Sequence, residues 1–458
     1  MKDNTISAIS TPLGESGIGI VRLSGPSAIK IAEKIFVGKD KVSNFPTHTI
    51  HYGQIRDPAT SELIDDVLIT VMKAPKTYTR EDVVEINAHG GIIPLKRILE
   101  LTLEYGAELA SPGEFTRRAF LNGRIDLCQA EAVIEVIRAK TDVGLRYALH
   151  QLKGDLSREI YTLRDQIVNI LAYLEASIDF PEEDIERLDS TQVKIRVEEI
   201  RDRIKGLIET SKYGKLFKEG IRTVIVGRPN VGKSSLLNAL LGEERAIVTS
   251  IPGTTRDTIE EAIDIEGIPL TLIDTAGLRH PIDQIEEKGV SRTRESLQLA
   301  DLVILVLDGS EKLTEEDIEI IEETRDKLRI IVINKIDLPQ TIELNNIQTL
   351  LDGVKIVRTS ATEKLGLDDL KEGIKEKFFL RGLPSINGIL ITNLRHKRAL
   401  QKACQSMERV IDTISNNLSE EFIALDLREA LNHLGAIIGE TINEDILSEI
   451  FSQFCIGK

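Results

Sequence analysis

The chain has 458 residues, and at this length we expect about three domains that each bury a core of their own. A formal net charge of −16 argues against a broad nucleic-acid-binding surface, and three cysteines (Cys128, Cys404 and Cys455) without a CxxC pair are typical of a reducing compartment. The first residues lack a basic segment before an apolar core and no run approaches about 18 apolar residues, so we predict a cytoplasmic protein without export or membrane spanning.

Residues 1–118 have the pattern of an α+β domain. Short runs with β character, separated by glycine and proline, lie at residues 17–25, 66–73 and 82–89. An apolar helical stretch follows at residues 92–105. The region closes with the basic pair Arg117 and Arg118, which is either a local nucleic-acid contact or a solvated helix face.

Residues 119–215 are predicted to form the first part of a helical domain. Apolar side chains recur there at spacings of three and four, which is the period of one helix face. The series comprises Leu156, Ile160, Leu163, Ile167, Ile170, Leu174 and Ile178. A stripe of this length must pack on another helix.

Residues 216–380 contain four motifs of a guanine-nucleotide site in their usual order. These are GRPNVGKSS (227–235), GTTRD (253–257), DTAG (274–277) and NKID (334–337). The first follows a β-type run and opens a helix, so its backbone N–H groups can surround phosphates. Lys233 supplies a cation to the terminal phosphates, Ser234 offers a hydroxyl to Mg²⁺, and Asp274 should hold the same ion through water.

The later motifs predict selectivity for guanine. Asn334 can bond the ring edge of the base, and the Asp337 carboxylate can accept two hydrogen bonds from guanine, where adenine would leave it unpaired. Ser360 and Ala361 follow the last strand pattern, where backbone amides would cap the guanine oxygen. Strand and helix patterns alternate through this region, which implies a parallel sheet with helices on both faces.

The predicted GTP-binding residues extend over all of these motifs. They are Asn230, Val231, Gly232, Lys233, Ser234, Ser235, Thr249, Ser250, Ile251, Pro252, Gly253, Thr254, Thr255, Asp274, Thr275, Ala276, Gly277, Asn334, Lys335, Asp337, Ser360 and Ala361.

Leu278 follows the DTAG motif, where many small GTPases carry the glutamine that orients the attacking water. An apolar side chain cannot orient water, so another group must supply stabilisation of roughly 4 to 7 kcal/mol. One candidate is a monovalent cation held by Asn230 and carbonyls of residues 249–254, and another is Glu286 acting on the water. The alternative is that Asn230 only braces the loop and Glu286 is a solvated helix charge.

Residues 381–458 return to a helical pattern. A second stripe with spacings of three and four comprises Leu400, Ala403, Met407, Val410 and Ile414, and another apolar series runs from Phe422 to Phe454. The basic residues 395–398 again allow a local nucleic-acid contact or a solvated face. We predict one helical domain, split by insertion of residues 216–380, since insertion is tolerated where a domain's two ends lie close together.

Three stretches outside the GTP motifs make the whole chain resemble the MnmE family of tRNA modification GTPases, also called TrmE. They are TREDVVEINAHGG (79–91), PGEFTRRAFLNGRIDLCQAEA (112–132) and CIGK (455–458). The resemblance implies an N-terminal α+β domain that dimerises and binds a formyl-tetrahydrofolate, a discontinuous helical domain, and an inserted Ras-like P-loop GTPase domain with a mainly parallel sheet. It also implies a homodimer and a flavin-dependent partner that together install an aminomethyl or carboxymethylaminomethyl group at the wobble uridine of certain tRNAs.

The resemblance further assigns ligands and catalytic roles. The potassium ligands would be Asn230, Thr249, Ile251 and Thr254, with Mg²⁺ on Ser234 and Thr255. The folate contacts would be Arg22, Glu81, Arg124 and Lys458, and the catalytic residues Glu286, Lys233 and Cys455. A folate carries a glutamate tail that pairs with cations and a pterin edge that pairs with a carboxylate.

Two residues of this set stay open. Position 124 is Arg, where the family commonly has Lys, so charge is kept while hydrogen-bond geometry changes. Cys455 is either a structural side chain or a participant in the modification chemistry. Two other functions also fit the motifs: a GTPase switch in ribosome assembly, and a folate-binding scaffold whose GTPase times assembly.

Overall fold

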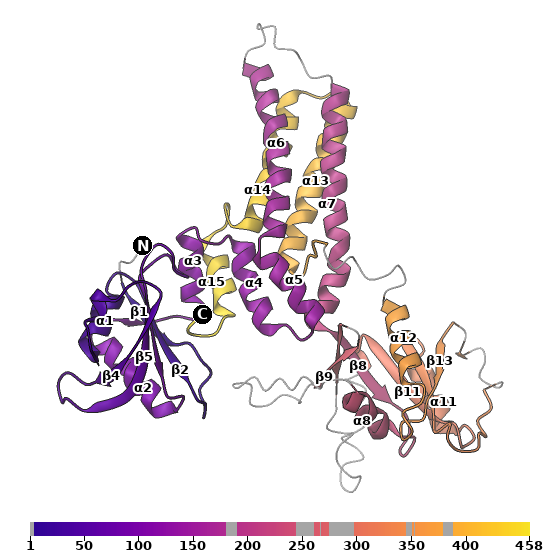
Figure 1. Cartoon of the computed structure of the whole chain (residues 1–458). Helices are drawn as coiled ribbons and strands as arrows, with labels where there is room; N and C mark the ends of the chain where they lie inside the picture. The colour runs from indigo at the N-terminus through magenta and orange to yellow at the C-terminus, as the bar shows by residue number, and fades with distance from the viewer. Residues whose placement is uncertain are drawn as a thin grey trace. The chain divides into compact units, whose positions relative to one another are not determined.

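The computed structural model describes residues 4–179, 190–243, 261–265, 267–273, 297–344, 350–351, 353–378 and 388–458. These divide into two compact units. The first unit comprises Met1–Ile134, Gln151–Ile200 and Lys402–Lys458, and the second comprises Glu135–His150 and Arg201–Gln401. Figure 1 shows the elements of both.

The first unit contains a seven-stranded sheet in the order β3-β4-β5-β6-β2-β1-β7. The strands are β1 Ile6–Ile9, β2 Gly19–Ser24, β3 Phe36–Gly38, β4 Thr49–Arg56, β5 Leu63–Met72, β6 Val83–Ala88 and β7 Glu108–Leu109. All neighbours are antiparallel except β1 and β7, which are parallel. Helices α1 (Ala28–Ile35) and α2 (Ile92–Glu104) pack on it, with the one-turn helix η1 (Val42–Asn44) beside α1.

Alternation along the strands explains why one face of this sheet is covered. In β5, Val67, Ile69 and Val71 are buried, and the residues between them are partly or fully exposed. The buried face joins Ile31 and Ile35 of α1 and Leu95 and Ile98 of α2 in one core. The runs expected at residues 17–25, 66–73 and 82–89 correspond to β2, β5 and β6. The pattern did not reveal β1, β3, β4 and β7, which are short or lie toward the sheet edges, where the apolar signal is weak.

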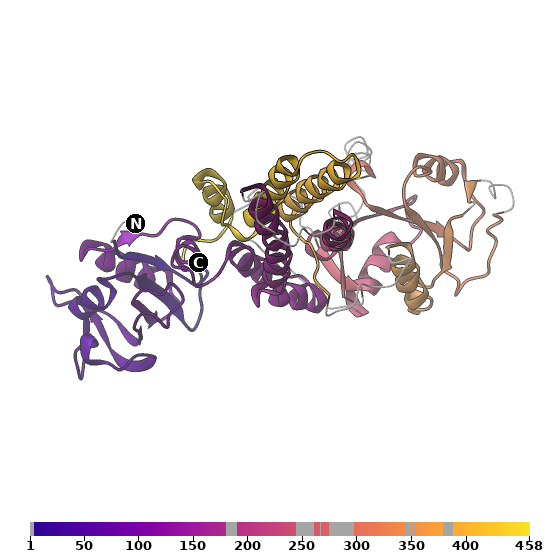
Figure 2. The same cartoon turned by 90° about the horizontal axis from the view of Figure 1, so that it is seen from above.

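Further helices lie in the middle and at the end of the chain. They are α3 Glu114–Leu121, α4 Leu127–Arg138, α5 Asp142–Leu152, α6 Asp155–Asp179, α7 Ser190–Glu219, α13 Leu394–Ser415, α14 Glu420–Ile438 and α15 Glu444–Ser452. Within the first unit α6 lies beside α14, as Figures 1 and 2 show, and α3 lies beside α15. The predicted stripe of α6 is buried from Leu156 to Leu174 and half-buried at Ile178, because α14 covers that face.

The second unit contains a six-stranded sheet in the order β13-β12-β11-β8-β10-β9. Its elements are β8 Ile221–Val226, α8 Lys233–Glu243, β9 Glu261–Ile265, β10 Ile268–Leu272, β11 Leu302–Asp308, α11 Glu315–Glu323, β12 Arg329–Asn334, β13 Lys355–Arg358 and α12 Leu367–Phe378. Only the edge strand β9 is antiparallel to its neighbour. Strands β11 and β12 are buried along their whole length, as expected for parallel strands covered on both faces.

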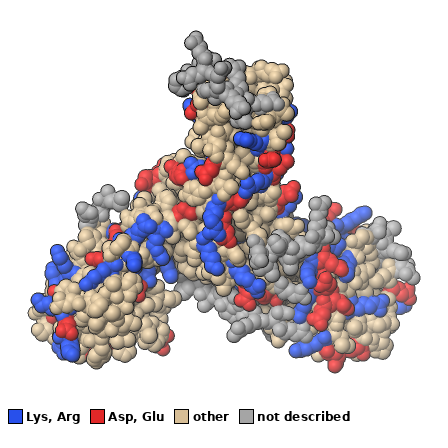
Figure 3. Space-filling view, turned by 45° about the horizontal axis from the view of Figure 1, so that its top comes forward, with Lys and Arg blue, Asp and Glu red and all other residues tan. Residues whose placement is uncertain are grey.

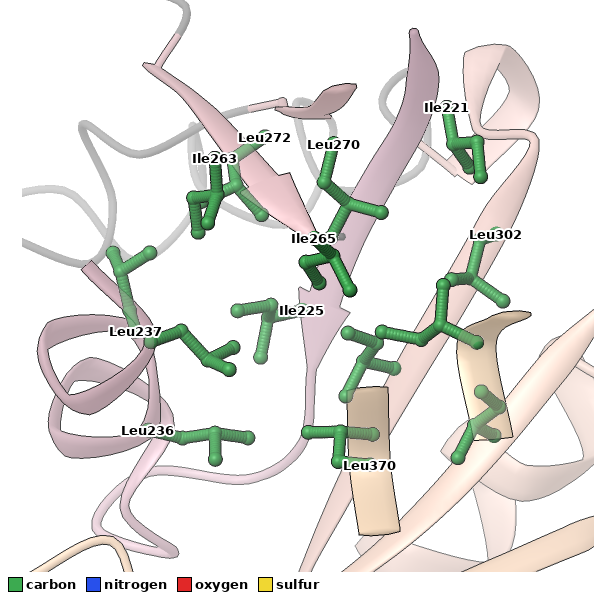
Figure 4. Close-up of a cluster of buried hydrophobic side chains, with 14 of the residues drawn as sticks. Ile221, Ile225, Leu236, Leu237, Ile263, Ile265, Leu270, Leu272, Leu302 and Leu370 are labelled. Atoms are coloured by element: carbon green, nitrogen blue, oxygen red, sulfur yellow. The ribbon is translucent and has the colours of Figure 1, made fainter. Parts of the chain in front are cut away.

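The core of the second unit joins this sheet to helices α8 and α12. Figure 4 shows Ile225 of β8 among Leu236 and Leu237 of α8, with Ile263 and Leu270 of the β9–β10 hairpin nearby. On the other face, Ile321 of α11 packs on the sheet. The capping box of α11 holds its first turn, because the Thr314 hydroxyl accepts from the amide of Asp317 and the Asp317 carboxylate accepts in return.

In the second unit, one carboxylate contacts both chain segments that connect the six-stranded sheet to the helices. Glu135, near the end of α4, accepts a hydrogen bond from the Lys218 ammonium at 2.9 Å and another from the Thr392 hydroxyl at 3.0 Å. Lys218 lies before β8 and Thr392 lies before α13. One buried side chain therefore joins the segment that enters the sheet domain to the segment that leaves it.

These observations confirm the expected fold class of an α+β N-terminal domain, a discontinuous helical domain and a domain with a mainly parallel sheet. The compact units divide the chain at residues other than 118, 215 and 380, since the second unit also includes Glu135–His150 and parts of α7 and α13. Among the described residues, no helix is both long and apolar enough to cross a membrane.

Candidate functional site

The phosphate loop connects β8 to α8 and contains two glycines at which a side chain would collide with neighbouring atoms. Gly232 has φ +99°, and a Cβ there would lie 2.2 Å from the Asn334 side-chain nitrogen. Gly227 is equally confined, because a Cβ would lie 2.4 Å from the carbonyl oxygen of Val306. Asn230 adopts φ 65° with its side chain exposed. The loop is thus tight enough to bring backbone groups to a ligand without a side chain in the way.

Lys233 begins α8 and lies over this loop. Its ammonium donates to the carbonyl oxygens of Gly227 at 2.6 Å and Arg228 at 2.8 Å. Burial lowers the pKa of the Lys233 ammonium, with partial opposition from Glu316. A phosphate anion at the loop would restore the pKa, because it would neutralise the partly buried charge. Ser234 and Ser235 follow on the exposed side of the first turn, where a hydroxyl is accessible to a metal ion.

Asn334 ties the phosphate loop to the loop that follows β13. Asn334 is 2% exposed. The amide nitrogen donates to the Val231 carbonyl at 3.0 Å, and the amide oxygen accepts from the Thr359 hydroxyl at 3.2 Å and the Ala361 amide at 3.1 Å. This bracing role was not expected from the motif alone. Its expected contact with the base stays a prediction.

The other members of the NKID motif differ in their surroundings. The Lys335 ammonium lies 2.6 Å from a carboxylate oxygen of Asp308. Burial raises the pKa of Asp308, but the hydrogen bonds from Lys335 and Ser310 outweigh it and leave the pKa below its ordinary value. Asp337 is exposed, so its carboxylate is accessible to a base.

The residues expected to cap the guanine oxygen lie on the same side of the sheet. The amide of Ser360 donates to the Leu365 carbonyl at 3.0 Å, and the amide of Ala361 donates to Asn334. A guanine oxygen at this position would therefore share or replace bonds that the protein makes internally. The proposed capping stays a prediction.

Several of the predicted site residues lie outside the described residues. They are Thr249, Ser250, Ile251, Pro252, Gly253, Thr254, Thr255, Asp274, Thr275, Ala276, Gly277, Leu278 and Glu286.

A second group of predicted site residues gathers in the first unit, around the C-terminal CIGK tail. The Arg22 guanidinium donates from Nε to Glu85 at 2.8 Å and from Nη1 to the Gly457 carbonyl at 3.1 Å. Burial and then the Arg22 charge lower the pKa of the Lys458 ammonium, against smaller effects of Cys455 and Glu85. Two cations close together, one of them half-buried, favour an anionic ligand such as a carboxylate.

Backbone contacts fix this tail against β1 and α3. Gly457 has φ +93°, and a Cβ there would lie 2.5 Å from the carbonyl oxygen of Ile9. The Gly113 amide donates to the Cys455 carbonyl at 3.4 Å, and the Phe115 amide donates to the Lys458 backbone oxygen at 3.2 Å. The Cys455 side chain is exposed, so the tail presents its thiol to solvent.

Glu81 and Arg124 lie on neighbouring parts of the first unit. Glu81 accepts from the Ser24 hydroxyl at 2.7 Å and pairs with Arg118 at 3.2 Å. The Arg124 guanidinium stacks 4.8 Å from the centre of the Tyr78 ring and donates to the Tyr78 carbonyl. Burial raises the pKa of Tyr78, opposed by its bond to Thr116 and by the charges of Arg124 and Arg22.

The arginine pair Arg117 and Arg118 within α3 forms ion pairs. Arg118 is 11% exposed in its side chain and pairs with Glu81 and Glu114, while Arg117 pairs with Glu444 at 2.7 Å. Sequence reasoning missed Arg118 and Tyr78 as partners of the predicted folate residues. The sequence signal for Arg118 was its place beside Arg117 within residues 112–132, in a single helix. On the face shown in Figure 3, acidic and basic side chains are interspersed over the coloured residues.

The donor chemistry fits some of the groups that the motifs imply. Ser234 offers a neutral hydroxyl of the kind Mg²⁺ accepts, and Asn230 an amide oxygen suited to a monovalent cation. Arg22 and Lys458 offer the cationic partners that a folate carboxylate needs. The described residues contain no cluster of three or more His, Cys, Asp or Glu side chains suited to a metal ion.

Comparison with known proteins identifies the family. A family model described as "MnmE helical domain" matches residues 127–455, and one described as "GTP-binding protein TrmE N-terminus" matches residues 5–124. The chain belongs to the MnmE family. The resemblance inferred from its motifs is thereby confirmed.

Similarity to MnmE relatives extends from one end of the chain to the other. The chain is 49% identical to the tRNA modification GTPase MnmE of Alkaliphilus oremlandii over 100% of this chain and 99% of the relative. It is 50% identical to that of Thermoanaerobacter pseudethanolicus over 99% of both chains. A crystal structure of the G domain of the T. maritima FeoB iron transporter is 31% identical over 34% of this chain and 98% of that chain, with a TM-score of 0.27.

Proposed function

We propose that this MnmE protein is a GTP hydrolase that takes part in modifying the wobble uridine of certain tRNAs. The observation that carries the proposal is the phosphate loop, tied through Asn334 to the loop that follows β13, in a chain that is similar to tRNA modification GTPases along its whole length. A flavin-dependent partner and a formyl-tetrahydrofolate-derived one-carbon unit would complete the addition of an aminomethyl or carboxymethylaminomethyl group at C5.

In the hydrolysis step the chain's own groups bind and orient the nucleotide. Backbone amides between Gly227 and Lys233 surround the phosphates, and the Lys233 ammonium turns from its loop carbonyls toward the terminal phosphates. Asp337 accepts from the guanine ring. Ser234 and Thr255 would hold Mg²⁺, which would supply positive charge to neutralise the phosphates.

We propose potassium activation for this chain, as the resemblance to the MnmE family implies. Leu278 cannot orient water, and K⁺ held by Asn230, Thr249, Ile251 and Thr254 would supply the missing charge stabilisation. The exposed Asn230 side chain at the phosphate loop supports this assignment. Glu286 would hold the attacking water, and Glu286→Ala should keep GTP affinity while slowing hydrolysis; an equal loss of binding would contradict its role.

The first unit would hold the folate and the reactive tail. Arg22 and Lys458 are placed to pair with a carboxylate, and Glu81 and Arg124 would complete the site. Cys455 is exposed beside these cations, which supports a role in the modification chemistry rather than a structural one. We also propose a homodimer through the N-terminal domain and a cytoplasmic location.

The domain limits follow the same proposal. Residues 1–118 would bind folate and dimerise, residues 119–215 and 381–458 would form the split helical domain, and residues 216–380 would bind GTP. Both ends of the GTPase insert enter helices, so nucleotide-dependent movement could be transmitted to the folate and tRNA site.

The first test is GTP hydrolysis by the purified chain in potassium and in sodium at equal ionic strength, with oligomeric state followed in a GTP transition-state mimic. We expect strong stimulation by potassium together with cation-dependent association. Asn230→Ala should remove the stimulation. Equal rates in both salts would contradict potassium activation and favour a GTPase switch in ribosome assembly.

The role of the tail is tested by Cys455→Ser, which keeps the shape of the tail. GTP hydrolysis should persist, while wobble-uridine modification with the partner protein should be lost. Modification at the wild-type rate would show that the thiol has no chemical role and would leave a folate-binding scaffold as the better description.

A further inference from the structure

Helix α5 lies outside the inserted GTPase domain in sequence, yet its residues pack into the core of the GTP-binding sheet. Residues Glu135–His150 belong to the second compact unit. Tyr147 of α5 is 5% exposed and packs against the Phe217 ring at the end of α7, with ring centres 5.3 Å apart. Both side chains join the core cluster that includes Ile265 and Ile268 of the β9–β10 hairpin.

The contact between α5 and the hairpin turn leaves no free space. Gly267 has φ +92°, and a Cβ there would lie 2.3 Å from a methyl carbon of Val143. The Gly267 amide donates to the Asp264 side chain at 2.6 Å, which fixes the turn. The Lys140 ammonium lies 3.5 Å from the Thr271 hydroxyl of β10. Helix α5 therefore contacts the turn of the hairpin, and Lys140, just before the helix, contacts its inner strand.

The β9–β10 hairpin pairs with the strand that leads to the phosphate loop, so its movement would affect the nucleotide site. Strand β10 pairs with β8, which leads into the phosphate loop, and the Ile273 amide donates to the Thr223 carbonyl at 2.9 Å. β10 ends at Leu272, two residues before Asp274 in the sequence. A shift of the hairpin would displace β8 and thereby the phosphate loop that follows it, because a packed strand moves as a rigid element.

We propose that α5 is a positioning element for GTP hydrolysis, and that Val143 and Tyr147 act through the β9–β10 hairpin without touching nucleotide. This inference rests on the proposed GTPase function and names a route for its regulation. Linkage makes the effect reciprocal for binding: if docking of α5 favours one nucleotide state, that state favours docking of α5. Docking of α5 would then depend on which nucleotide is bound, and it would also change the activity of the GTP site.

The first test compares Val143→Ala with a matched core substitution in the full chain. We expect Val143→Ala to lower kcat for GTP in potassium by about fivefold, the lower end of typical coupling, with KM changed by less than about twofold. The control is Ile374→Val in α12, which lies in the same core cluster and contacts β12 and β13 instead. It should leave kcat unchanged. Equal effects of the two substitutions would reduce the role of Val143 to general packing and overturn the proposal.

The second test uses the close approach of Gly267 to Val143. Gly267→Ala should lower kcat because the added methyl meets Val143, and Val143→Ala in the same chain should restore part of the loss by removing that methyl carbon. Strictly additive losses would contradict a direct contact. The backbone strain of alanine at this φ is present in both backgrounds, so it cancels in the comparison.

The reciprocal effect is measured by hydrogen exchange of α5 in the wild-type chain with GDP and with a GTP transition-state mimic. We expect α5 amides to exchange at different rates in the two states, while amides of α1 do not change. Identical exchange of α5 would overturn the inference. If wild-type GTP hydrolysis itself were absent, the proposed function would fail, whereas normal hydrolysis with an unaffected Val143→Ala variant would reject only the inference.

Discussion

Asn334 and Asp337 belong to one motif, yet the structure gives them different roles that mutation can separate. Asn334 is buried and makes three hydrogen bonds that join the phosphate loop, through Val231, to the loop at Thr359 and Ala361. Asp337 is exposed. We therefore expect Asn334→Ala to destabilise the nucleotide-free protein, and Asp337→Ala to leave it unchanged.

The size of the effect follows from the bonds lost. Each net hydrogen bond contributes about 0.5–1.5 kcal/mol, and unpaired buried groups add to the loss, so Asn334→Ala should cost about 2–4 kcal/mol locally. That corresponds to about 30- to 700-fold faster opening, at about tenfold per 1.4 kcal/mol. Asp337→Ala should instead weaken GTP binding by about hundredfold, because a charged acceptor of two hydrogen bonds is removed.

The assay is hydrogen exchange of the β8 and α8 amides without nucleotide, together with GTP affinity by fluorescence titration. Local exchange rates are needed because a multidomain chain does not unfold in one step. Unchanged exchange in Asn334→Ala would refute the bracing role. Faster exchange in Asp337→Ala would show that the two residues act alike.

Three further predictions concern the tail, acid stability and the connections of the inserted domain. Gly457→Ala places a methyl group against the β1 backbone, so the tail should detach and the Gly113 and Phe115 amides that donate to it should exchange faster with solvent; unchanged exchange would contradict the docking. The folded-state pKa of Asp308 is lowered, so between that pKa and the ordinary 3.8 the unfolded state binds more protons and stability falls as pH falls. The Asp308→Asn variant should therefore lose less stability than the wild-type chain as pH falls through this range. An equal loss of stability in the two chains would contradict the pairing of Asp308 with Lys335. Glu135→Gln removes the charged partner of Lys218, so limited proteolysis followed by mass spectrometry should show faster cleavage at the segment around Thr392 before α13; equal rates would contradict the joining role of Glu135.

Much of the functional assignment was already present in local sequence. The four GTP motifs, the stripe from Leu156 to Ile178 and the CIGK tail are short patterns in which residue type and spacing specify chemistry or helix period directly. The strand pattern correctly predicted a mainly parallel sheet, because strands buried on both faces have continuous apolar runs. The antiparallel edge strand β9 was not predicted, since a short strand with charged residues lacks that signal.

Only the tertiary structure decided which distant residues act together. Arg22 and Gly457 are 435 residues apart in the sequence, and they meet because the tail is held against the sheet that contains β2. Asn334 became a brace because parallel pairing places the ends of β8, β12 and β13 at one edge. Helix α5 joined the GTP-binding core because Val143 fits the space left by Gly267. Local periodicity specifies each element, but strand register and packing determine which side chains come into contact.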